Sequence, residues 1–109
     1  MTPSKADDSG PRTVGDVDRL IHEPARLMIL MYLSSLEEAD YLFLTRATGL
    51  TWGNLSSHLS KLEAAGYVAI TKRFLNKKPN SLVRLTKSGR AAVRDYTHTM
   101  RKALTQIKG

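Results

Sequence analysis

A set of small and polar side chains lies between Thr51 and Lys61, spaced so that one face of a helix would carry them. Leu55, Leu59 and Leu62 recur at helical spacing and predict a buried stripe. A step of about 100° per residue then turns the other set outward. Its members are Gly53, Asn54, Ser57, Ser60, Lys61 and Ala64. An asparagine amide pairs well with adenine and a serine hydroxyl with several base edges, so this face suits the major groove of a duplex.

Five basic residues and no acidic residue follow between Tyr67 and Arg84. They are Lys72, Arg73, Lys77, Lys78 and Arg84. Lysines near a hairpin tip can reach phosphates or the minor groove, and Lys61 on the helix is also expected to meet phosphate. Thr51 is expected to cap the helix, whose free N–H groups favour an anion, and Gly53 allows a close backbone approach. The alternative for the basic ribbon is an ordinary solvated hairpin.

Trp52 and His58 each have two roles open to them. Trp52 can pack against the preceding helix or stack on a sugar–phosphate strand. His58 lies near the edge of the apolar stripe, so it can be a hydrogen-bonded structural histidine or a DNA contact. His58 is not a metal-ligand candidate, because it has no partner ligands.

Charge is divided unevenly along the 109 residues. Residues 1–66 hold six basic and nine acidic side chains, whereas residues 67–109 hold eleven basic and one acidic. A basic half of this kind is typical of a surface that meets a polyanion. The absence of cysteine excludes disulfides, thiolate zinc sites and iron–sulfur clusters, and fits a cytoplasmic location. No apolar run approaches the roughly 18 residues of a membrane span, and the N-terminus has no apolar signal core.

The elements that must position these residues can be read from turn and cap residues. Residues 1–12 are rich in Pro, Ser, Gly and Asp and are expected to be a disordered tail. Helices are expected over 14–22, 25–36, 42–48, 52–65 and 87–108, with a polar turn at 37–40. Gly49 and Gly66 are expected to end two of them. Strands are expected over 67–71 and 82–85, joined by a turn that contains Asn76, Pro79, Asn80 and Ser81.

Two helices carry more apolar surface than one small domain can cover. Met28, Met31 and Tyr32 make the helix over 25–36 apolar almost all round. The last helix repeats apolar residues with a spacing of three and four, at Val93, Tyr96, Met100, Ala103 and Ile107. Both sets predict a homodimer interface, and packing within one chain is the alternative for the last helix.

Three segments resemble, in the right order, the motifs of bacterial and archaeal winged-helix regulators of the MarR and ArsR type. HEPARLMILMYL is similar to their first helix, LTWGNLSSHLSKLEAAGYV to their recognition helix, and LVRLTKSGRAAV to their strand and last helix. The resemblance covers residues 20–93 and implies a dimeric transcriptional regulator that binds operator DNA. Metal sensing does not carry over, because the chain has no Cys and three scattered His.

The predicted fold is α+β and mostly α: a winged helix-turn-helix over 13–86, with a two-stranded wing, and a dimerisation helix over 87–109. The predicted function is sequence-specific binding of double-stranded DNA by a homodimeric repressor. The alternative is a winged-helix module that docks on another protein. No arrangement of nucleophile, base or paired carboxylates suggests an enzyme, and no cofactor is expected. The sequence does not define a small-molecule effector.

Overall fold

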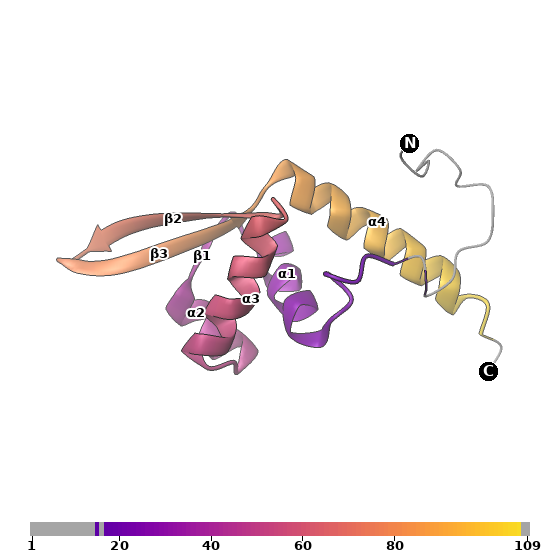
Figure 1. Ribbon diagram of the computed structural model, residues 1–109, viewed down its shortest axis with the longest axis horizontal. Coiled ribbons are helices and arrows are strands. Elements are labelled where there is room, and N and C mark those ends of the chain that lie inside the picture. Colours follow the sequence, from indigo (N-terminus) through magenta and orange to yellow (C-terminus); the bar gives the residue numbers. More distant parts are fainter. Residues whose placement is uncertain (1–14, 16, 108–109) are drawn as a thin grey trace.

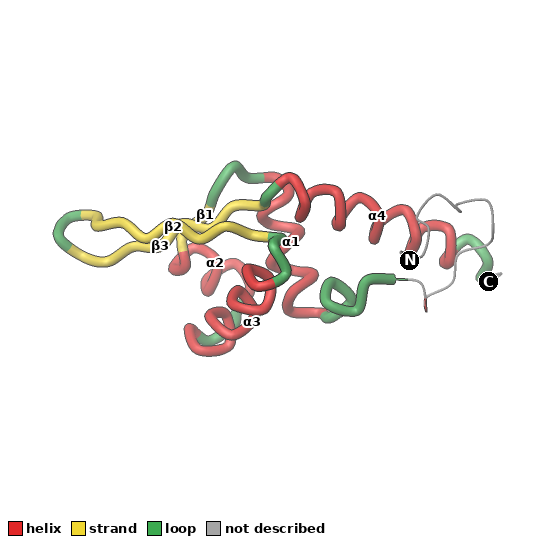
Figure 2. Tube along the Cα trace, turned by 45° about the horizontal axis from the view of Figure 1, so that its top comes forward, coloured by secondary structure: helices red, strands yellow, loops and turns green. Residues whose placement is uncertain are grey.

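The computed structural model describes residues 15 and 17–107. The tail expected over residues 1–12 lies outside this range. The described elements follow in the order α1 (Pro24–Ser35), β1 (Ala39–Asp40), α2 (Tyr41–Thr48), α3 (Trp52–Ala64), β2 (Val68–Leu75), β3 (Lys78–Leu85) and α4 (Lys87–Leu104). Helices α1, α2 and α3 form the centre, and the β2–β3 ribbon and α4 project from it in opposite directions (Figures 1 and 2).

Helix α1 begins where the sequence places a proline in the first turn. Glu23 accepts a hydrogen bond from the backbone N–H of Arg26 at 2.8 Å, so its carboxylate caps the helix. Ile29, Leu30 and Leu33 are fully buried in the core. The expected span of 25–36 is therefore confirmed to within one residue at each end.

Helices α2 and α3 form the expected helix-turn-helix. Asp40 caps α2 by accepting from the N–H of Phe43, and Gly49 ends it with a left-handed φ of 74°. Thr51 caps α3 by accepting from the N–H of Asn54 at 3.1 Å. The leucine stripe at positions 55, 59 and 62 is fully buried, as predicted.

The sheet has one strand more than expected, in the order β1-β3-β2. Ala39 and Asp40, expected in a polar turn, pair with Val83 and Leu82 of β3. Beyond that point β2 and β3 continue as a two-stranded antiparallel ribbon, the wing.

The wing turn differs from the expected one. Strands β2 and β3 run on to Leu75 and Lys78, so the turn is only Asn76–Lys77, with φ of 51° and 64°. Two consecutive positive φ values are those of a type I′ turn, whose twist matches an antiparallel ribbon. Pro79 and Asn80, expected in the turn, are strand residues.

The segment before α1 corrects the helix expected over 14–22. Residues 17–23 form turns and bends. Asp18 organises them, since its Oδ1 accepts from the N–H of Leu20 at 2.9 Å and its Oδ2 accepts from the Tyr67 hydroxyl. Val17 and Ile21 are buried in the core, so the described part of the segment packs as a turn and not as a continuous helix, while residues 14 and 16 lie outside the described range.

Helix α4 crosses close to the end of α3. Thr86 caps it, and its hydroxyl also donates to the carbonyl of Gly66 at 2.6 Å. Gly89 is required here, because a Cβ atom would lie 2.0 Å from the carbonyl oxygen of Tyr67. The helix ends at Leu104, earlier than the expected Lys108, which lies outside the described residues.

Candidate nucleic-acid interface

The outward face of α3 carries the polar residues that the sequence assigned to it. Thr51, Gly53, Asn54, Ser57 and Lys61 are all exposed. Because the leucine stripe lies in the core, these residues point away from the helical centre. The helix thus presents a shallow polar surface that begins at its capped N-terminus.

His58, on the same helix, is half-buried and hydrogen-bonded within the chain. Its Nδ1 lies 3.1 Å from Nη1 of Arg26, and Nε of Arg26 donates to the carbonyl of Leu20 at 2.6 Å. A guanidinium group can only donate, so the imidazole nitrogen is the acceptor. The bond connects α3 to the start of α1. Of the two roles considered for His58, this is the structural one.

The same contact reaches the cap of α1. The pKa of Glu23 is lowered, mainly because its carboxylate accepts from the N–H of Arg26 and also because Arg26 and His58 lie nearby. Glu23, Arg26 and His58 therefore form one polar cluster that fixes α3 relative to α1.

Trp52 packs against α2 but is not enclosed. Its ring centroid lies 5.3 Å from that of Tyr41, with the rings tilted by 45°, and 57% of the residue is exposed. Trp52, Tyr41 and Leu42 line one wall of a groove of about 470 Å³. The wing contributes the other wall through Leu75, Asn76 and residues 78–81. Packing is thus observed for Trp52, and stacking on a nucleic-acid strand stays a prediction.

The wing carries its five basic residues on more than one side. All five are exposed, and there is no acidic residue from Tyr67 to Arg94. Side chains alternate along a strand, so Arg73, Lys78 and Arg84 share one face of the ribbon, while Lys72 lies on the other and Lys77 in the turn. Arg73 Nε donates to Asn80 Oδ1 at 2.9 Å across the strands, which holds that guanidinium in place.

The sequence analysis missed the apolar residues of the wing. Phe74 is 76% exposed and Leu75 is 48% exposed, close to the turn. Both residues lie among the wing lysines in the sequence, but strand β2 was expected to end at Thr71. With the strand ending at Thr71, Phe74 fell in the expected loop, so the side on which its side chain lies could not be predicted.

The proposed dimer residues fall into two groups. Tyr96 and Ala103 are buried within the chain, and the Tyr96 hydroxyl lies 2.9 Å from Nδ1 of His22. Met28 and Tyr32 are half-buried, and Tyr32 donates to the carbonyl of Ala47. The exposed apolar surface instead surrounds an apolar groove of about 420 Å³ between α1 and α4. Its lining includes Leu27, Leu30, Met31, Val93, Met100 and Leu104, while Ile107 lies beyond the helix and is 69% exposed.

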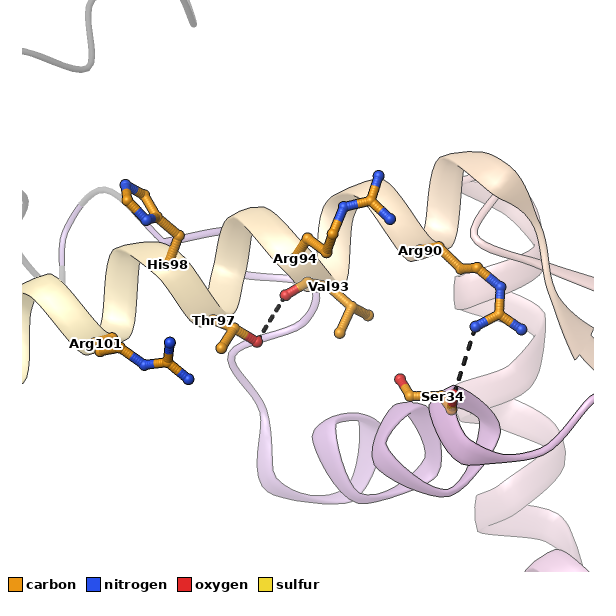
Figure 3. Close-up of a pocket in the computed structure, with 7 residues that line it drawn as sticks. All are labelled: Ser34, Arg90, Val93, Arg94, Thr97, His98 and Arg101. Atoms are coloured by element: carbon orange, nitrogen blue, oxygen red, sulfur yellow. Dashed lines mark hydrogen bonds between the residues drawn. The ribbon is translucent and has the colours of Figure 1, made fainter.

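A second groove beside it, of about 410 Å³, was also missed. Its lining includes Arg90, Arg94, His98 and Arg101 of α4. Figure 3 shows Arg90 reaching toward Ser34 near the end of α1, whereas Arg94 and His98 project away from Ser34. Nη1 of Arg90 lies 3.5 Å from the carbonyl oxygen of Ser34. The basic residues of this groove recur along α4 at positions 90, 94 and 101, so they could have been noted from the sequence.

Within the described part of the chain, no group of three or more His, Cys, Asp and Glu residues could hold a metal ion. Among the same residues, no helix is both long and apolar enough to cross a membrane.

Comparison with known proteins shows the family to which the chain belongs. Residues 25–104 match the model of the winged helix DNA-binding domain. An uncharacterized protein of Methanocaldococcus jannaschii is 31% identical over 80 residues, which is 73% of this chain and 87% of that protein.

Solved structures share the fold. The transcriptional regulator homologue of Pyrococcus horikoshii superposes with a TM-score of 0.77 at 25% identity, covering 82% of this chain and 88% of that one. The transcriptional repressor CouR, solved on a 23-mer DNA duplex, gives 0.69 at 18% identity over 81% of this chain and 62% of its own. BldR of Sulfolobus solfataricus gives 0.64 at 19% identity over 85% and 62%. The chain belongs to the winged helix DNA-binding domain family and has the fold of MarR-family transcriptional regulators.

Proposed function

We propose that this protein is a sequence-specific, double-stranded DNA-binding transcriptional regulator that acts in the cytoplasm as a homodimeric repressor. One observation carries the proposal: α3 exposes a small polar face, and the adjoining wing exposes five basic residues with no acidic residue among them. A polar helix face suits base edges, and a basic ribbon suits the flanking phosphates.

In this proposal α3 enters the major groove. Asn54 and Ser57 would read base edges, and Lys61 would meet phosphate. The N-terminus of α3, capped by Thr51, favours a backbone phosphate because its N–H groups and helix dipole attract an anion. Trp52 would lie against the sugar–phosphate strand, and His58 would hold the helix in place through Arg26.

The wing would grip the neighbouring backbone. Lys72, Arg73, Lys77, Lys78 and Arg84 lie on both faces of the ribbon and in its turn, so phosphates on either side of a groove are within their reach. Contacts of this kind carry no sequence information but supply much of the affinity.

The homodimer is proposed from the apolar groove between α1 and α4. Met31 is 64% exposed and Leu104 is 53% exposed at its rim. A two-fold axis along this groove would bury both and leave two wings and two α3 helices free for DNA. Val93 and Met100, also predicted for the interface, line the same groove, whereas Met28, Tyr32 and Ile107 do not line it. CouR, a repressor with the same fold, was solved on a DNA duplex, which supports the choice of partner.

A docking module is the second candidate function. Leu42 and Phe43 on α2 are 49% and 44% exposed and would offer a protein partner an apolar surface. The acid-free wing argues against this reading, since a docking module has no need of it.

Selection from random duplex DNA tests the two functions. The first predicts a recovered sequence with two-fold symmetry, bound with a steep dependence on salt. Failure to bind any duplex at low salt would leave the docking module.

A further inference from the structure

Phe74 is the most exposed large apolar side chain in the described part of the chain, at 76%. It lies one residue pair behind the last pair of the wing, which joins Leu75 and Lys78. Phosphate contacts come from cationic and polar groups and make no use of an apolar ring.

The hairpin geometry places an apolar partner beside Phe74. Pro79 is paired with it across the ribbon, so both side chains lie on the same face. In a two-residue hairpin the pair next to the turn is hydrogen-bonded, so Phe74 and Pro79 form the following, non-hydrogen-bonded pair, whose side chains lie closer together. The two residues make one apolar ridge on a ribbon with a tight, fixed turn.

The other face of the wing tip is different. Leu75 lines the groove that also contains Trp52, and Arg73 is bonded to Asn80. Phe74 does not line that groove. Pro79 does line it, so Phe74 is the member of the apolar pair that lies outside the groove.

Charge identifies what the ridge meets. Lys72 shares its face, and Lys77 and Lys78 follow in the turn and strand, with no acidic residue from Tyr67 to Arg94. The partner must accept an apolar ring between flanking cations, which matches the stacked bases and phosphate walls of a duplex minor groove.

The reach of the wing is sufficient. β1 pairs no further than Leu82, so four residues of β3 extend beyond it to Lys78. At roughly 3.3 Å per residue this is about 13 Å of free ribbon, against a minor groove about 7.5 Å deep.

We propose that Phe74, backed by Pro79, is an apolar wedge that enters the minor groove beside the major groove occupied by α3 and partly unstacks one base step. This inference rests on the proposed DNA-binding function. A wedge is easiest to insert at pyrimidine–purine steps, so Phe74 would select for TA or CA at a position that no polar side chain reads.

The test uses the duplex recovered by selection, with 2-aminopurine at the step facing the wing and a fluorophore pair on its ends. Wild-type protein is expected to raise 2-aminopurine fluorescence and to bend the duplex by about 20–90°. Phe74→Ala is expected to lose both signals and about 5- to 150-fold in affinity, the range for removing one stacking side chain. Phe74→Leu should keep most of each signal, because leucine also wedges.

Leu75→Ala is the matched control, since it removes an apolar residue from the same hairpin on its opposite face. It should bend DNA as the wild type does. A Phe74→Ala protein that binds and bends the duplex unchanged, or a Leu75→Ala protein that loses as much, overturns the wedge alone. A wild-type protein that selects no duplex overturns the proposed function as well. Circular dichroism checks folding, which the exposed position of Phe74 leaves intact.

Discussion

Asn54 is the residue on α3 best placed to distinguish one base from another. It is exposed in the first turn, where its backbone N–H is already bonded to Thr51. Its side-chain amide therefore has no part in the cap. Ser57 and Lys61 follow one and two turns later on the same face.

Replacing Asn54 with Ala should cost about 1–3 kcal/mol on the selected sequence and much less on random DNA, because the lost bonds are to base edges. Competition binding with the two duplexes measures this. Ser88→Ala, exposed on α4 outside the proposed DNA surface, is the control and should change neither. Equal losses of Asn54→Ala on both duplexes would make Asn54 a backbone contact.

Tyr67 predicts a pH dependence of stability. Burial, followed by the hydrogen bond to Asp18, raises the pKa of its hydroxyl to about 12 from 10.0. Because the pKa is raised in the folded state, the protonated Tyr67 hydroxyl makes its full contribution to the free energy of unfolding below about pH 10. That contribution is lost as the pH rises through 12. Tyr67→Phe should therefore be less stable than wild type at pH 8, with a gap that narrows between pH 10 and 12. Urea unfolding of both proteins across this range measures the gap, and a constant gap would contradict the assignment.

At the scale of the element, the wing is expected to supply phosphate contacts. Replacing both Lys77 and Lys78 with Ala should weaken binding to all sequences alike. Each lost phosphate contact flattens the log–log salt slope by about 0.9, so the slope should become shallower by up to about 2 per protomer.

The control removes two cations from α4 in place of two from the wing tip. Arg90 and Arg94 lie on α4, which projects away from the wing (Figure 1). Arg90→Ala with Arg94→Ala changes the net charge equally and should leave the slope close to that of wild type. If the two double variants change the salt slope equally, the wing lysines act only through the net charge of the protein.

The elements that local chemistry specifies could be predicted from the sequence. Helix α3 has a leucine stripe, a threonine cap and a glycine with φ of 80° just after it, and each signal is local. The segment before α1 also has a capping pattern, but its apolar residues, Val17 and Ile21, pack on the core as a turn. Tertiary contacts, above all that of Asp18 with Tyr67, decide its shape and leave no local signal.

The sequence predicted which exposed polar and basic residues form the site. It did not predict on which face of the wing each side chain lies. Because side chains alternate along a strand, Lys72 and Arg73 lie on opposite faces of the wing. This rule could not be applied to the tip from the sequence, because Pro79 suggested a turn there and not a strand. Pro79 is tolerated in β3 because β1 pairs with only Val83 and Leu82, so the outer edge of β3 is free near the tip. The exposure of Phe74 follows from that longer ribbon and could not be read before it.

At the scale of the whole molecule, the proposed DNA surface and the apolar groove lie on different elements. The wing and α3 hold the first, and α1 and α4 the second. Since the wing and α4 project in opposite directions (Figure 2), a partner covering the groove need not obstruct the wing.

A dimer formed through that groove would hold two α3 helices for one operator, with half-sites about 10 base pairs apart. Met31→Glu with Leu104→Glu would place unpaired charges in the interface and should yield monomers. Both residues are exposed in the single chain, so the variant should stay folded. It should lose tight binding to the full operator, because the second half-site no longer benefits from the high local concentration of a linked subunit. Ala91→Glu, on α4 outside both grooves, should remain dimeric. Sedimentation with DNA titration separates these outcomes: a wild type that is monomeric at micromolar concentration, or a Met31→Glu, Leu104→Glu protein that is still dimeric, would remove the groove as the interface.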